Sequence, residues 1–435
     1  MMKTLNLLKE KWKDKKNPFI VSDNNSFFFK DLLDVDTDFL SEIKQGDIIA
    51  LIGDFDLISI ATLFKLIDLG AIVAPITSTT SNDHSYYIET IKAQYVIKDG
   101  NIVSKFTKKN DHNLIVSLRL KKQPGLIFFS TGTTGKPKAI LHDVSLLFKR
   151  FLTPRPSYKT LNFLMFDHMG GINTLLHTIF NGGTIIGTKD RSVRGILNVC
   201  QEHSIEVLPT TPTFLRMMLM SGYIPDKIPK SIKIISYGTE LMDQPTLNEF
   251  CHLLPNIDFK QTYGLSEFCV FRVKSKARDS LFMKIGGEGV SIKKENDMLY
   301  IKSDFAMLGY LNAESPFDEN GWYNTKDIIK EHDEYIKIIG RNTDILNVGG
   351  LKFMKSEVEE VALKYDGIEQ VSVYAKQNSI TGQHVEIIIE CKDNYKIMKS
   401  ELNKFFNSSL PKHMVPKKII FNKVEVNHRF KKKMT

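Results

Sequence analysis

The sequence contains little cysteine and no long, uninterrupted apolar run. Its four cysteines are scattered and form no C-x-x-C pair: Cys200, Cys251, Cys269 and Cys391. Such thiols are typical of a reduced, cytoplasmic protein rather than one stabilised by disulfides. Residues 1–16 are rich in lysine and lack the apolar core of a signal peptide. The most apolar region, 47–76, is interrupted by charged residues, so we predict no membrane span.

Size and charge set broad limits on the protein class. A chain of 435 residues is long enough for two or three domains. Its 42% hydrophobic and 25% charged residues are ordinary for a globular protein, and it has no internal repeat. The formal net charge of +9 is spread over many lysines, so we expect no nucleic-acid partner. A polyanionic small molecule, or a protein partner rich in phosphate or acid, fits this charge.

The most informative stretch, residues 125–142, lacks the spacing of a P-loop. A P-loop has four residues between its first glycine and the Gly-Lys pair, whereas Gly132 and Gly135-Lys136 enclose only two. The apolar run 126–129 predicts a buried strand that leads into a loop. Glycines there let backbone N–H groups approach oxygens closely. The loop also offers hydroxyl donors and positive charge: Ser130, Thr131, Thr133, Thr134, Lys136 and Lys138. We predict that it binds a polyphosphate.

The order of predicted elements favours an α/β fold. Residues 47–53 and 70–76 are predicted strands, and residues 57–69 between them carry apolar side chains at helical spacing. A strand, a helix and a strand in about thirty residues form a parallel crossover unit. Similar alternation continues through residues 182–209 and 232–253. Because ligands of open α/β sheets lie beyond the carboxyl ends of strands, we expect Gly238, Thr239 and Glu240, which follow a strand, to contact the same ligand.

Residues 130–138, Ser-Thr-Gly-Thr-Thr-Gly-Lys-Pro-Lys, resemble at every position the phosphate-binding loop of the adenylate-forming (AMP-binding) superfamily. This superfamily comprises acyl- and aryl-CoA synthetases, the adenylation domains of peptide synthetases, and luciferases. The resemblance implies an α/β fold with a large N-terminal AMP-binding body, residues 1–341, of mostly parallel sheets flanked by helices. It implies a small, mobile α+β lid domain over residues 342–435. It also implies ATP, Mg²⁺ and a small-molecule carboxylic acid as ligands.

Residues 261–267, Gln-Thr-Tyr-Gly-Leu-Ser-Glu, resemble a second motif of the family, Tyr-Gly-x-Thr/Ser-Glu. The resemblance implies that Tyr263, followed by Gly264, stacks on adenine. It implies that Ser266 and Thr262 reach the α-phosphate. The carboxylate of Glu267 is the implied magnesium ligand, since Mg²⁺ takes oxygen ligands and keeps few protein contacts.

Two further segments resemble the ribose site and the hinge of the family. Asp327 ends Gly-Trp-Tyr-Asn-Thr-Lys-Asp, which is similar to Tyr-x-Thr-Gly-Asp except that Lys326 replaces the glycine. The resemblance implies that Asp327 accepts both ribose hydroxyls and that Arg341 completes the ribose and phosphate contacts. Thr343 stands where the family has a pivot Asp or Lys. Gly350 matches a glycine lining the thiol tunnel, where a Cβ would obstruct a pantetheine arm.

The C-terminal region resembles the lid of the family but lacks one glycine. The pattern predicts helices over 356–364 and 397–406 and strands over 371–375 and 385–390. The stretch 410–416 is similar to Leu-Pro-x-Tyr-Met-Val-Pro of the lid. The family then places a catalytic lysine in a Gly-Lys pair, and that glycine is missing here. We assign Lys431 to this role, with Lys432 as the next choice, and a solvated basic tail remains an alternative.

The acid pocket is indicated by His168 and Gly171, which are similar to the His-x-x-Gly element of the family. In that interpretation the side chain of His168 closes the acid pocket. The alternative is that His168 is a histidine of the core. Phe166 is not followed by the Asp-x-Ser pattern of amino-acid-activating domains. No carboxylate is evidently placed to pair with an α-amino group. The substrate class that follows is a plain acyl or aryl acid.

These resemblances predict an AMP-forming acid–thiol ligase. The acid is activated to acyl-AMP with release of pyrophosphate, and the acyl group passes to CoA or to the phosphopantetheine of an acidic acyl-carrier protein. Two alternatives remain open. One is an amino-acid-activating enzyme that loads a carrier protein. The other is a non-enzymatic adenylate-binding or scaffold protein, favoured only by the glycine missing before Lys431 and by Lys326.

Overall fold

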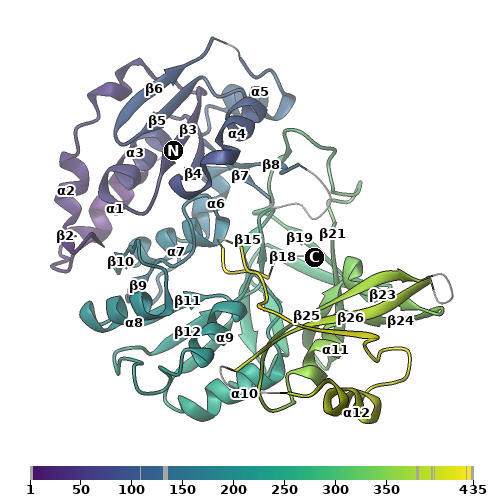
Figure 1. Ribbon diagram of the computed structural model, residues 1–435. Helices are drawn as coiled ribbons and strands as arrows, with labels where there is room; N and C mark the ends of the chain where they lie inside the picture. Colours follow the sequence, from purple (N-terminus) through teal and green to yellow (C-terminus); the bar gives the residue numbers. More distant parts are fainter. Residues whose placement is uncertain are drawn as a thin grey trace.

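Two seven-stranded sheets form the larger part of the molecule (Figure 1). The computed structural model describes residues 3–107, 109–130, 136–378, 382–392, 395, 397–427 and 429–432. One sheet has the order β13 (Asp258–Gln261), β12 (Ile234–Tyr237), β11 (Val207–Thr210), β9 (Lys159–Leu161), β10 (Thr184–Ile186), β1 (Ile20–Ser22) and β2 (Asn25–Phe27). The other has the order β20 (Gly309–Tyr310), β8 (Ala139–Asp143), β7 (Gly125–Phe129), β4 (Ile72–Thr77), β3 (Ile48–Gly53), β5 (Tyr95–Lys98) and β6 (Asn101–Lys105).

The central strands of both sheets are parallel, and their apolar sequences explain why. β3 and β4 pair in parallel, with Ile48 opposite Ile72, so this predicted crossover unit is confirmed. Every residue of β4 and of β7 is buried. Parallel strands are covered on both faces, and they therefore need continuous apolar runs rather than alternation. Antiparallel pairs occur at the edges, as between β7 and β8.

Helices cover the faces of these two sheets (Figure 1). They are α1 (Thr4–Trp12), α2 (Phe29–Asp34), α3 (Leu57–Asp68), α4 (His84–Ile91), α5 (Asn113–Lys121), α6 (Val144–Lys149), α7 (Met169–Phe180), α8 (Val193–Glu202), α9 (Pro212–Met220) and α10 (Gln244–Leu253), with 3₁₀ turns η1 (Asp38–Glu42) and η2 (Ser78–Asp83). In α3, Asp56 caps the N-terminus by accepting a 2.8 Å hydrogen bond from the Ser59 amide. The helix ends before Gly70, whose φ of +78° favours glycine.

A third sheet is antiparallel throughout, and the sequence analysis did not predict it. Its order is β16 (Arg272–Ser275), β17 (Met283–Gly286), β22 (Tyr335–Arg341), β21 (Tyr323–His332), β19 (Met298–Ser303) and β18 (Val290–Glu295). A two-stranded ribbon, β14 (Gly264–Leu265) and β15 (Cys269–Val270), lies before it in the chain. In β21 buried and more exposed positions alternate, because one face packs on a core while the other faces solvent.

The C-terminal part follows the 3₁₀ turn η3 (Asn342–Asp344) and has its own apolar cluster, which includes Val358 and Phe406. Its elements are the hairpin β23 (Ile345–Val348) and β24 (Leu351–Met354), α11 (Lys355–Ala362), the sheet β25 (Ile368–Asn378), β26 (Gly382–Cys391) and β27 (Lys418–Phe421), and α12 (Lys399–Ser409). All four predicted elements of this part are present. The domain boundary at 341/342 stays a prediction.

The last described residues, 427 and 429–432, leave this part and return to the junction with the two parallel sheets (yellow in Figure 1). They are called the C-terminal tail below. None of the helices in the described ranges is long and apolar enough to cross a membrane.

Candidate active site

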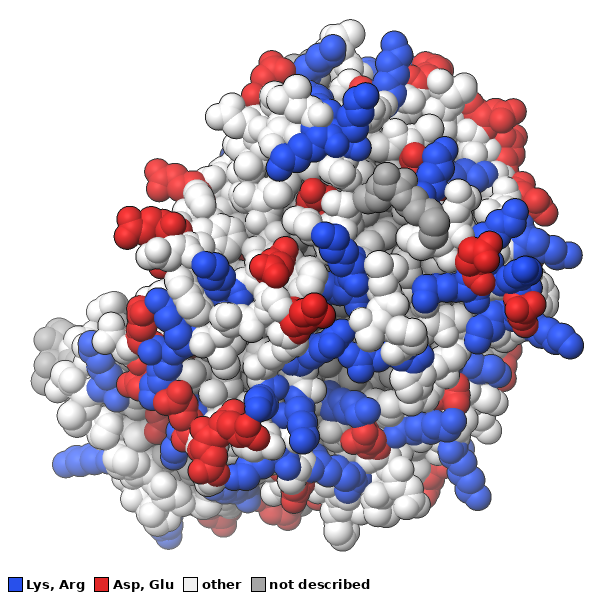
Figure 2. Space-filling model, turned by 180° about the vertical axis from the view of Figure 1, so that it is seen from behind, with Lys and Arg blue, Asp and Glu red and all other residues white. Residues whose placement is uncertain are grey.

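A cavity of about 2,250 Å³ lies where the two parallel sheets, the antiparallel sheet and the C-terminal part meet. Fifteen lysine and arginine residues line it in the described part of the chain, against nine aspartate and glutamate residues. Figure 2 shows lysines and arginines gathered around a hollow at the centre of one face. Drug-sized pockets occupy roughly 300–1,000 Å³, so this cavity has room for a nucleotide and a second ligand. Its excess of positive charge suits polyanions.

Tyr263, Asp327 and Arg341 form a connected group on one wall of the cavity. The Tyr263 hydroxyl donates a 2.6 Å hydrogen bond to Asp327 Oδ2, and Arg341 Nε donates to Oδ1 at 3.1 Å. Burial raises the pKa of the Asp327 carboxyl above its usual value, and Arg341 opposes that shift. Each carboxylate oxygen keeps a second lone pair. Asp327 can therefore still accept hydrogen bonds from a ligand.

The register of two antiparallel strands produces this group. Asp327 on β21 lies directly opposite Arg341 on β22. The Asp327 amide donates to the Thr325 hydroxyl at 3.1 Å, which fixes the turn of backbone between them. Lys326, at the turn, has a φ of +60°, a left-handed conformation that favours glycine. Lysine thus stands at a backbone position whose conformation glycine adopts without strain.

Glu267 lies on the same cavity, held by a residue that the sequence analysis missed. Its side chain is 8% exposed, and its Oε1 accepts a 2.7 Å hydrogen bond from the Tyr310 hydroxyl. The ammonium of Lys138 lies 4.7 Å from the centre of the Tyr310 ring. Tyr310 thereby connects the predicted metal carboxylate to a lysine of the predicted phosphate loop. Pairing of β20 with β8, with Tyr310 opposite Ile140, brings these distant segments together.

The Ser266 backbone is fixed by a buried histidine. His142, which is 1% exposed, donates a ring N–H to the Ser266 carbonyl at 2.7 Å. Burial lowers the pKa of His142 to about 4, so the ring is neutral near pH 7. Thr262 is held in turn by its hydroxyl, which donates to the Tyr237 carbonyl at 3.0 Å. The second predicted motif is thus positioned from both parallel sheets.

The predicted phosphate loop is described only at its ends. The Ser130 amide donates to the Lys138 carbonyl at 3.0 Å, and the Lys138 amide donates to the Ser130 hydroxyl. Both residues line the cavity. Lys136 lies outside the cavity lining, with its ammonium 5.7 Å from the Tyr86 ring. Five predicted residues lie outside the described residues: Thr131, Gly132, Thr133, Thr134 and Gly135.

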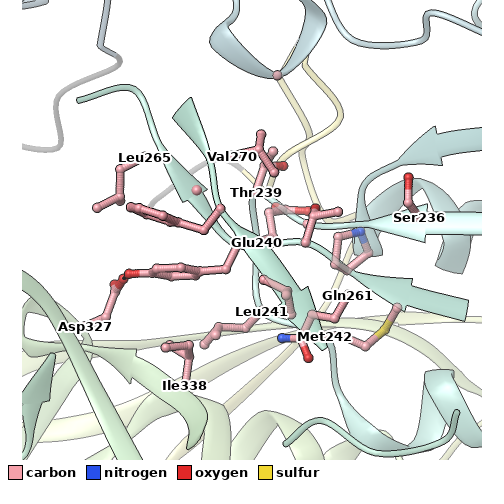
Figure 3. Close-up of a pocket in the computed structure, with 18 of the residues that line it drawn as sticks. Ser236, Thr239, Glu240, Leu241, Met242, Gln261, Leu265, Val270, Asp327 and Ile338 are labelled. Carbon is pink, nitrogen blue, oxygen red and sulfur yellow. Dashed lines mark hydrogen bonds between the residues drawn. The ribbon is translucent and has the colours of Figure 1, made fainter. Parts of the chain in front are cut away.

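Residues 238–240 follow β12 and line the cavity, as expected (Figure 3). A side chain at Gly238 would collide with Thr262, so this close approach requires glycine. Thr239 has a φ of +70°, and such backbone strain is often stored at functional sites. Glu240 accepts hydrogen bonds from the Thr213 amide at 3.3 Å and from the Lys432 amide at 3.0 Å. The segment therefore also holds the C-terminal tail.

The structure separates the two candidate lysines of the tail. Lys432 Nζ lies 3.1 Å from Glu359 Oε2 on α11, so its charge is paired within the C-terminal part. Lys431 is partly buried in the cavity lining. Burial lowers its pKa to about 8, with Glu240 opposing the shift and Arg429 and Arg341 adding to it. Lys432 also lines the cavity, so the choice of Lys431 as the cation that meets a ligand stays a prediction.

Arg429 is a second cation of the tail, and the sequence analysis did not select it. Its Nη2 lies 2.7 Å from Oδ2 of Asp167, and the two side chains are 7% and 6% exposed. Arg429 lies in a basic run and could not be told from its neighbours, and the sequence analysis did not select Asp167 either. The 262 residues between them leave no local signal of this contact.

His168 lines the cavity beside the tail, whereas Gly171 does not. Burial and the positive charges of Arg429 and Lys431 lower the pKa of His168 well below its ordinary value. Its Nδ1 accepts a 3.0 Å hydrogen bond from the Gly170 amide, so the neutral ring carries its proton on Nε2. Gly171 packs against the Met165 carbonyl, which a side chain would overlap. Glycine is thus required here for packing.

Comparisons with known proteins agree with this geometry. The AMP-binding enzyme family matches residues 39–287, and the AMP-binding enzyme C-terminal domain matches residues 357–429. The chain belongs to the AMP-binding enzyme family. The predicted family, its α/β fold and its class as an AMP-forming acid–thiol ligase are confirmed.

Several relatives of this AMP-binding enzyme have been characterised. A 2-succinylbenzoate–CoA ligase of Geobacillus sp. (strain WCH70) is 21% identical over 422 residues, which cover 87% of this chain and 84% of the relative. ATP-bound MatB from Rhodopseudomonas palustris has a TM-score of 0.81 at 17% identity, with 98% and 96% of the two chains covered. MenE from Bacillus subtilis, solved with ATP and a magnesium ion, has a TM-score of 0.75 at 16% identity, with 99% and 98% covered.

Gly350, like Lys136 and Gly171, lies outside the cavity lining of this AMP-binding enzyme. Gly349 and Gly350 form the turn of the β23–β24 hairpin, with φ angles of +61° and +85°. No atom of the described residues lies within 4 Å of the position that a Cβ of Gly350 would take. The hairpin turn accounts for the positive φ of this glycine, and its role in a thiol tunnel stays a prediction.

Proposed function

We propose that the protein activates a carboxylic acid with ATP and passes the acyl group to the thiol of coenzyme A. One observation carries this proposal. Both parts of the chain contribute to a single cavity, in which Lys431 of the tail faces the same space as Glu267 and the Tyr263–Asp327–Arg341 group. A site for a nucleotide alone would need no partly buried cation from the C-terminal end of the chain.

In the first step, a carboxylate oxygen attacks the α-phosphorus of ATP. The bond from that phosphorus to the pyrophosphate oxygen breaks, and an acyl-adenylate forms. The protein makes no covalent bond in this step, so it acts by alignment and by offsetting charge. Asp327 and Arg341 hold the ribose, Ser130 and Lys138 face the phosphates, and Lys431 approaches the oxygens at which negative charge develops.

The residues around Glu267 fit a magnesium ion. Mg²⁺ is usually held by one or two carboxylates, substrate phosphates and water rather than by a full set of protein ligands. Accordingly, no group of three or more His, Cys, Asp or Glu side chains placed for a metal occurs among the described residues. Bound there, the ion would offset phosphate charge and orient the pyrophosphate leaving group. Tyr310 fixes the orientation of the Glu267 carboxylate.

In the second step, a thiolate attacks the carbonyl carbon, the bond from that carbon to the AMP oxygen breaks, and a thioester and AMP are released. The tail fills the cavity beside His168, and we propose that it withdraws before the thiol enters. Characterised relatives are named CoA ligases, which favours CoA as the acceptor. The phosphopantetheine of an acidic carrier protein is the second acceptor to test, since the chain carries a net charge of +9.

The scaffold alternative loses part of its support. Lys326 has a left-handed backbone, which glycine adopts readily, and the Asp327 amide is still held by the Thr325 hydroxyl. The glycine missing before Lys431 is also compatible with a cation in the cavity, because the tail turns at Phe430, whose φ is +52°.

The proposal is tested by measuring pyrophosphate release over a panel of fatty, aryl, dicarboxylic and amino acids. Each acid is combined with CoA, with a purified phosphopantetheinylated carrier protein, or with neither. Acid-dependent pyrophosphate release together with an acyl-CoA product supports the proposal. If a thioester forms on the carrier protein but not on CoA, the carrier protein is the acceptor. ATP binding without pyrophosphate release or acyl-AMP from any acid contradicts the proposal and favours the scaffold.

A further inference from the structure

The ion pair between Arg429 and Asp167 is a buried contact between the C-terminal tail and the body of the protein. Both side chains are more than nine-tenths buried, and the two nearest atoms are 2.7 Å apart. Asp167 Oδ1 and Arg429 Nε have no hydrogen-bond partner among the described residues. Each member therefore depends largely on the other, because a buried charge is costly when it is left without its partner.

Asp167 occupies a position that links the tail to the predicted acid pocket. It directly precedes His168, the N-cap of α7, which lines the cavity. Burial raises the pKa of the nearby Asp54 carboxyl, and the like charge of Asp167 adds to that shift. Asp167 itself is absent from the cavity lining, whereas Arg429 is part of it. The pair thus connects a wall of the cavity to a residue just behind that wall.

The backbone around Arg429 sets where Lys431 lies. Asn427 Oδ1 accepts hydrogen bonds from the amides of Arg429 at 2.9 Å and Lys431 at 3.1 Å. The Phe430 carbonyl accepts a 2.9 Å hydrogen bond from the Thr211 hydroxyl. The tail is therefore a tight turn in which a shift of Arg429 moves Lys431 as well.

The Phe430 side chain anchors the same turn in the body. Its ring lies 5.2 Å from that of Phe163 and 5.1 Å from that of Phe214, and it packs against the apolar cluster of the first parallel sheet. This aromatic contact fixes the place of the turn. The ion pair fixes its rotation and depth, because a salt bridge between two buried side chains is directional.

We propose that Asp167 is a positioning residue for acyl-adenylate formation: by pairing with Arg429 it sets the depth at which Lys431 enters the cavity. This inference rests on the proposed function and deepens it. Asp167 touches neither substrate nor reacting atoms in this account. It acts through Arg429 and the tail turn, and it serves the first step only, because the tail withdraws before the thiol enters.

The two half-reactions distinguish positioning from general structural support. In Asp167→Asn the buried Arg429 loses its counter-charge, and acyl-AMP formation should fall on the order of 100-fold. Thioester formation from supplied synthetic acyl-AMP should stay within about threefold of wild type, since that step does not use the docked tail. Arg429→Gln should show the same split, and Arg429→Lys, which keeps the charge, should recover part of the lost rate. The double variant Asp167→Asn/Arg429→Gln should be no slower than either single variant.

A matched control is the buried pair of Arg216 and Asp243, whose side chains are 6% and 8% exposed and which joins α9 to α10 within the body. Asp243→Asn should lower stability and reduce both half-reactions together. Circular dichroism checks that each variant is folded, and limited proteolysis should cleave the tail faster in Asp167→Asn than in Asp243→Asn.

Equal loss of both half-reactions in Asp167→Asn, or unchanged acyl-AMP formation, would overturn the inference. Additive effects in the double variant would overturn it as well. Wild-type protein that makes no acyl-AMP from any acid instead contradicts the proposed function, so the two failures are distinguishable.

Discussion

The hydroxyl of Tyr310 donates a 2.7 Å hydrogen bond to the carboxylate of Glu267, while the ring of Tyr310 faces the ammonium of Lys138 at 4.7 Å. One side chain therefore contacts both a candidate metal ligand and a candidate phosphate ligand. Glu267 is 8% exposed, and a buried carboxylate without a donor is destabilised in its charged form. Removal of the Tyr310 hydroxyl should therefore weaken the binding of magnesium by the Glu267 carboxylate.

Tyr310→Phe should accordingly raise the Mg²⁺ concentration needed for half-maximal acyl-AMP formation by roughly 10- to 100-fold, since a lost hydrogen bond to a charged group is worth roughly 1.5–3 kcal/mol. The ring contact with Lys138 is kept. Tyr300→Phe is the control, because Tyr300 bonds Asn324 away from the cavity. An unchanged Mg²⁺ dependence in Tyr310→Phe would remove this role from Tyr310.

Replacement of the two tail lysines should have unequal effects. Lys431→Ala removes the cation that we place beside the reacting oxygens and should slow acyl-AMP formation about 100-fold, the typical loss for one charge-stabilising group. Lys432→Ala breaks a pair with Glu359 that is partly exposed, with side chains 22% and 17% accessible, so its effect should stay below about tenfold. The rates are compared in single-turnover assays. The reverse order would assign the role to Lys432.

The pH dependence follows from the lowered pKa of Lys431, about 8. The charged form is the one required, and it is lost as the pH rises through that value. The kcat/KM for acyl-AMP formation should therefore fall above about pH 8, because this parameter reports the free enzyme. In Lys431→Arg the side chain stays charged over this pH range. Its kcat/KM should therefore not fall above about pH 8, even if the variant is slower than wild type. A wild-type profile that is flat from pH 7 to 10 is incompatible with the assignment.

Gly350→Ala tests whether this glycine serves the turn or a tunnel. With a φ of +85°, alanine should be strained in the hairpin and lower the free energy of unfolding by about 1–2 kcal/mol. Both half-reactions should fall together or stay near wild type. Chemical denaturation and the two assays provide the readouts. A selective loss of thioester formation would restore the tunnel role.

The sequence predicted those parts of the fold that depend on contacts between residues close together in the chain. The crossover unit β3–α3–β4 follows from two apolar runs and a helical period, and the structure pairs those strands in parallel. The antiparallel sheet was missed because its strands alternate polar and apolar residues and contain many lysines. In β21, for example, Lys326 and Lys330 project from a strand whose buried residues are spaced two apart.

The motifs located most of the site but not the contacts that organise it. Tyr263, Glu267, Asp327 and Lys431 line one cavity, as ordered motifs of one family should. Tyr310, His142 and the Arg429–Asp167 pair act through contacts between segments 43 to 262 residues apart. Such pairs carry no spacing signal in one sequence, and only the packing of the sheets and the return of the tail bring them together.

The most direct test of the account follows oxygen from the acid into AMP. The acid is prepared with both carboxylate oxygens as ¹⁸O and incubated with the enzyme, ATP, Mg²⁺ and CoA. Because the carboxylate attacks the α-phosphorus and the thiol later breaks the carbon–oxygen bond, the AMP released should carry one ¹⁸O and the pyrophosphate none. Mass spectrometry measures both products. Label in pyrophosphate or phosphate, or AMP formed without label, would contradict the proposed chemistry.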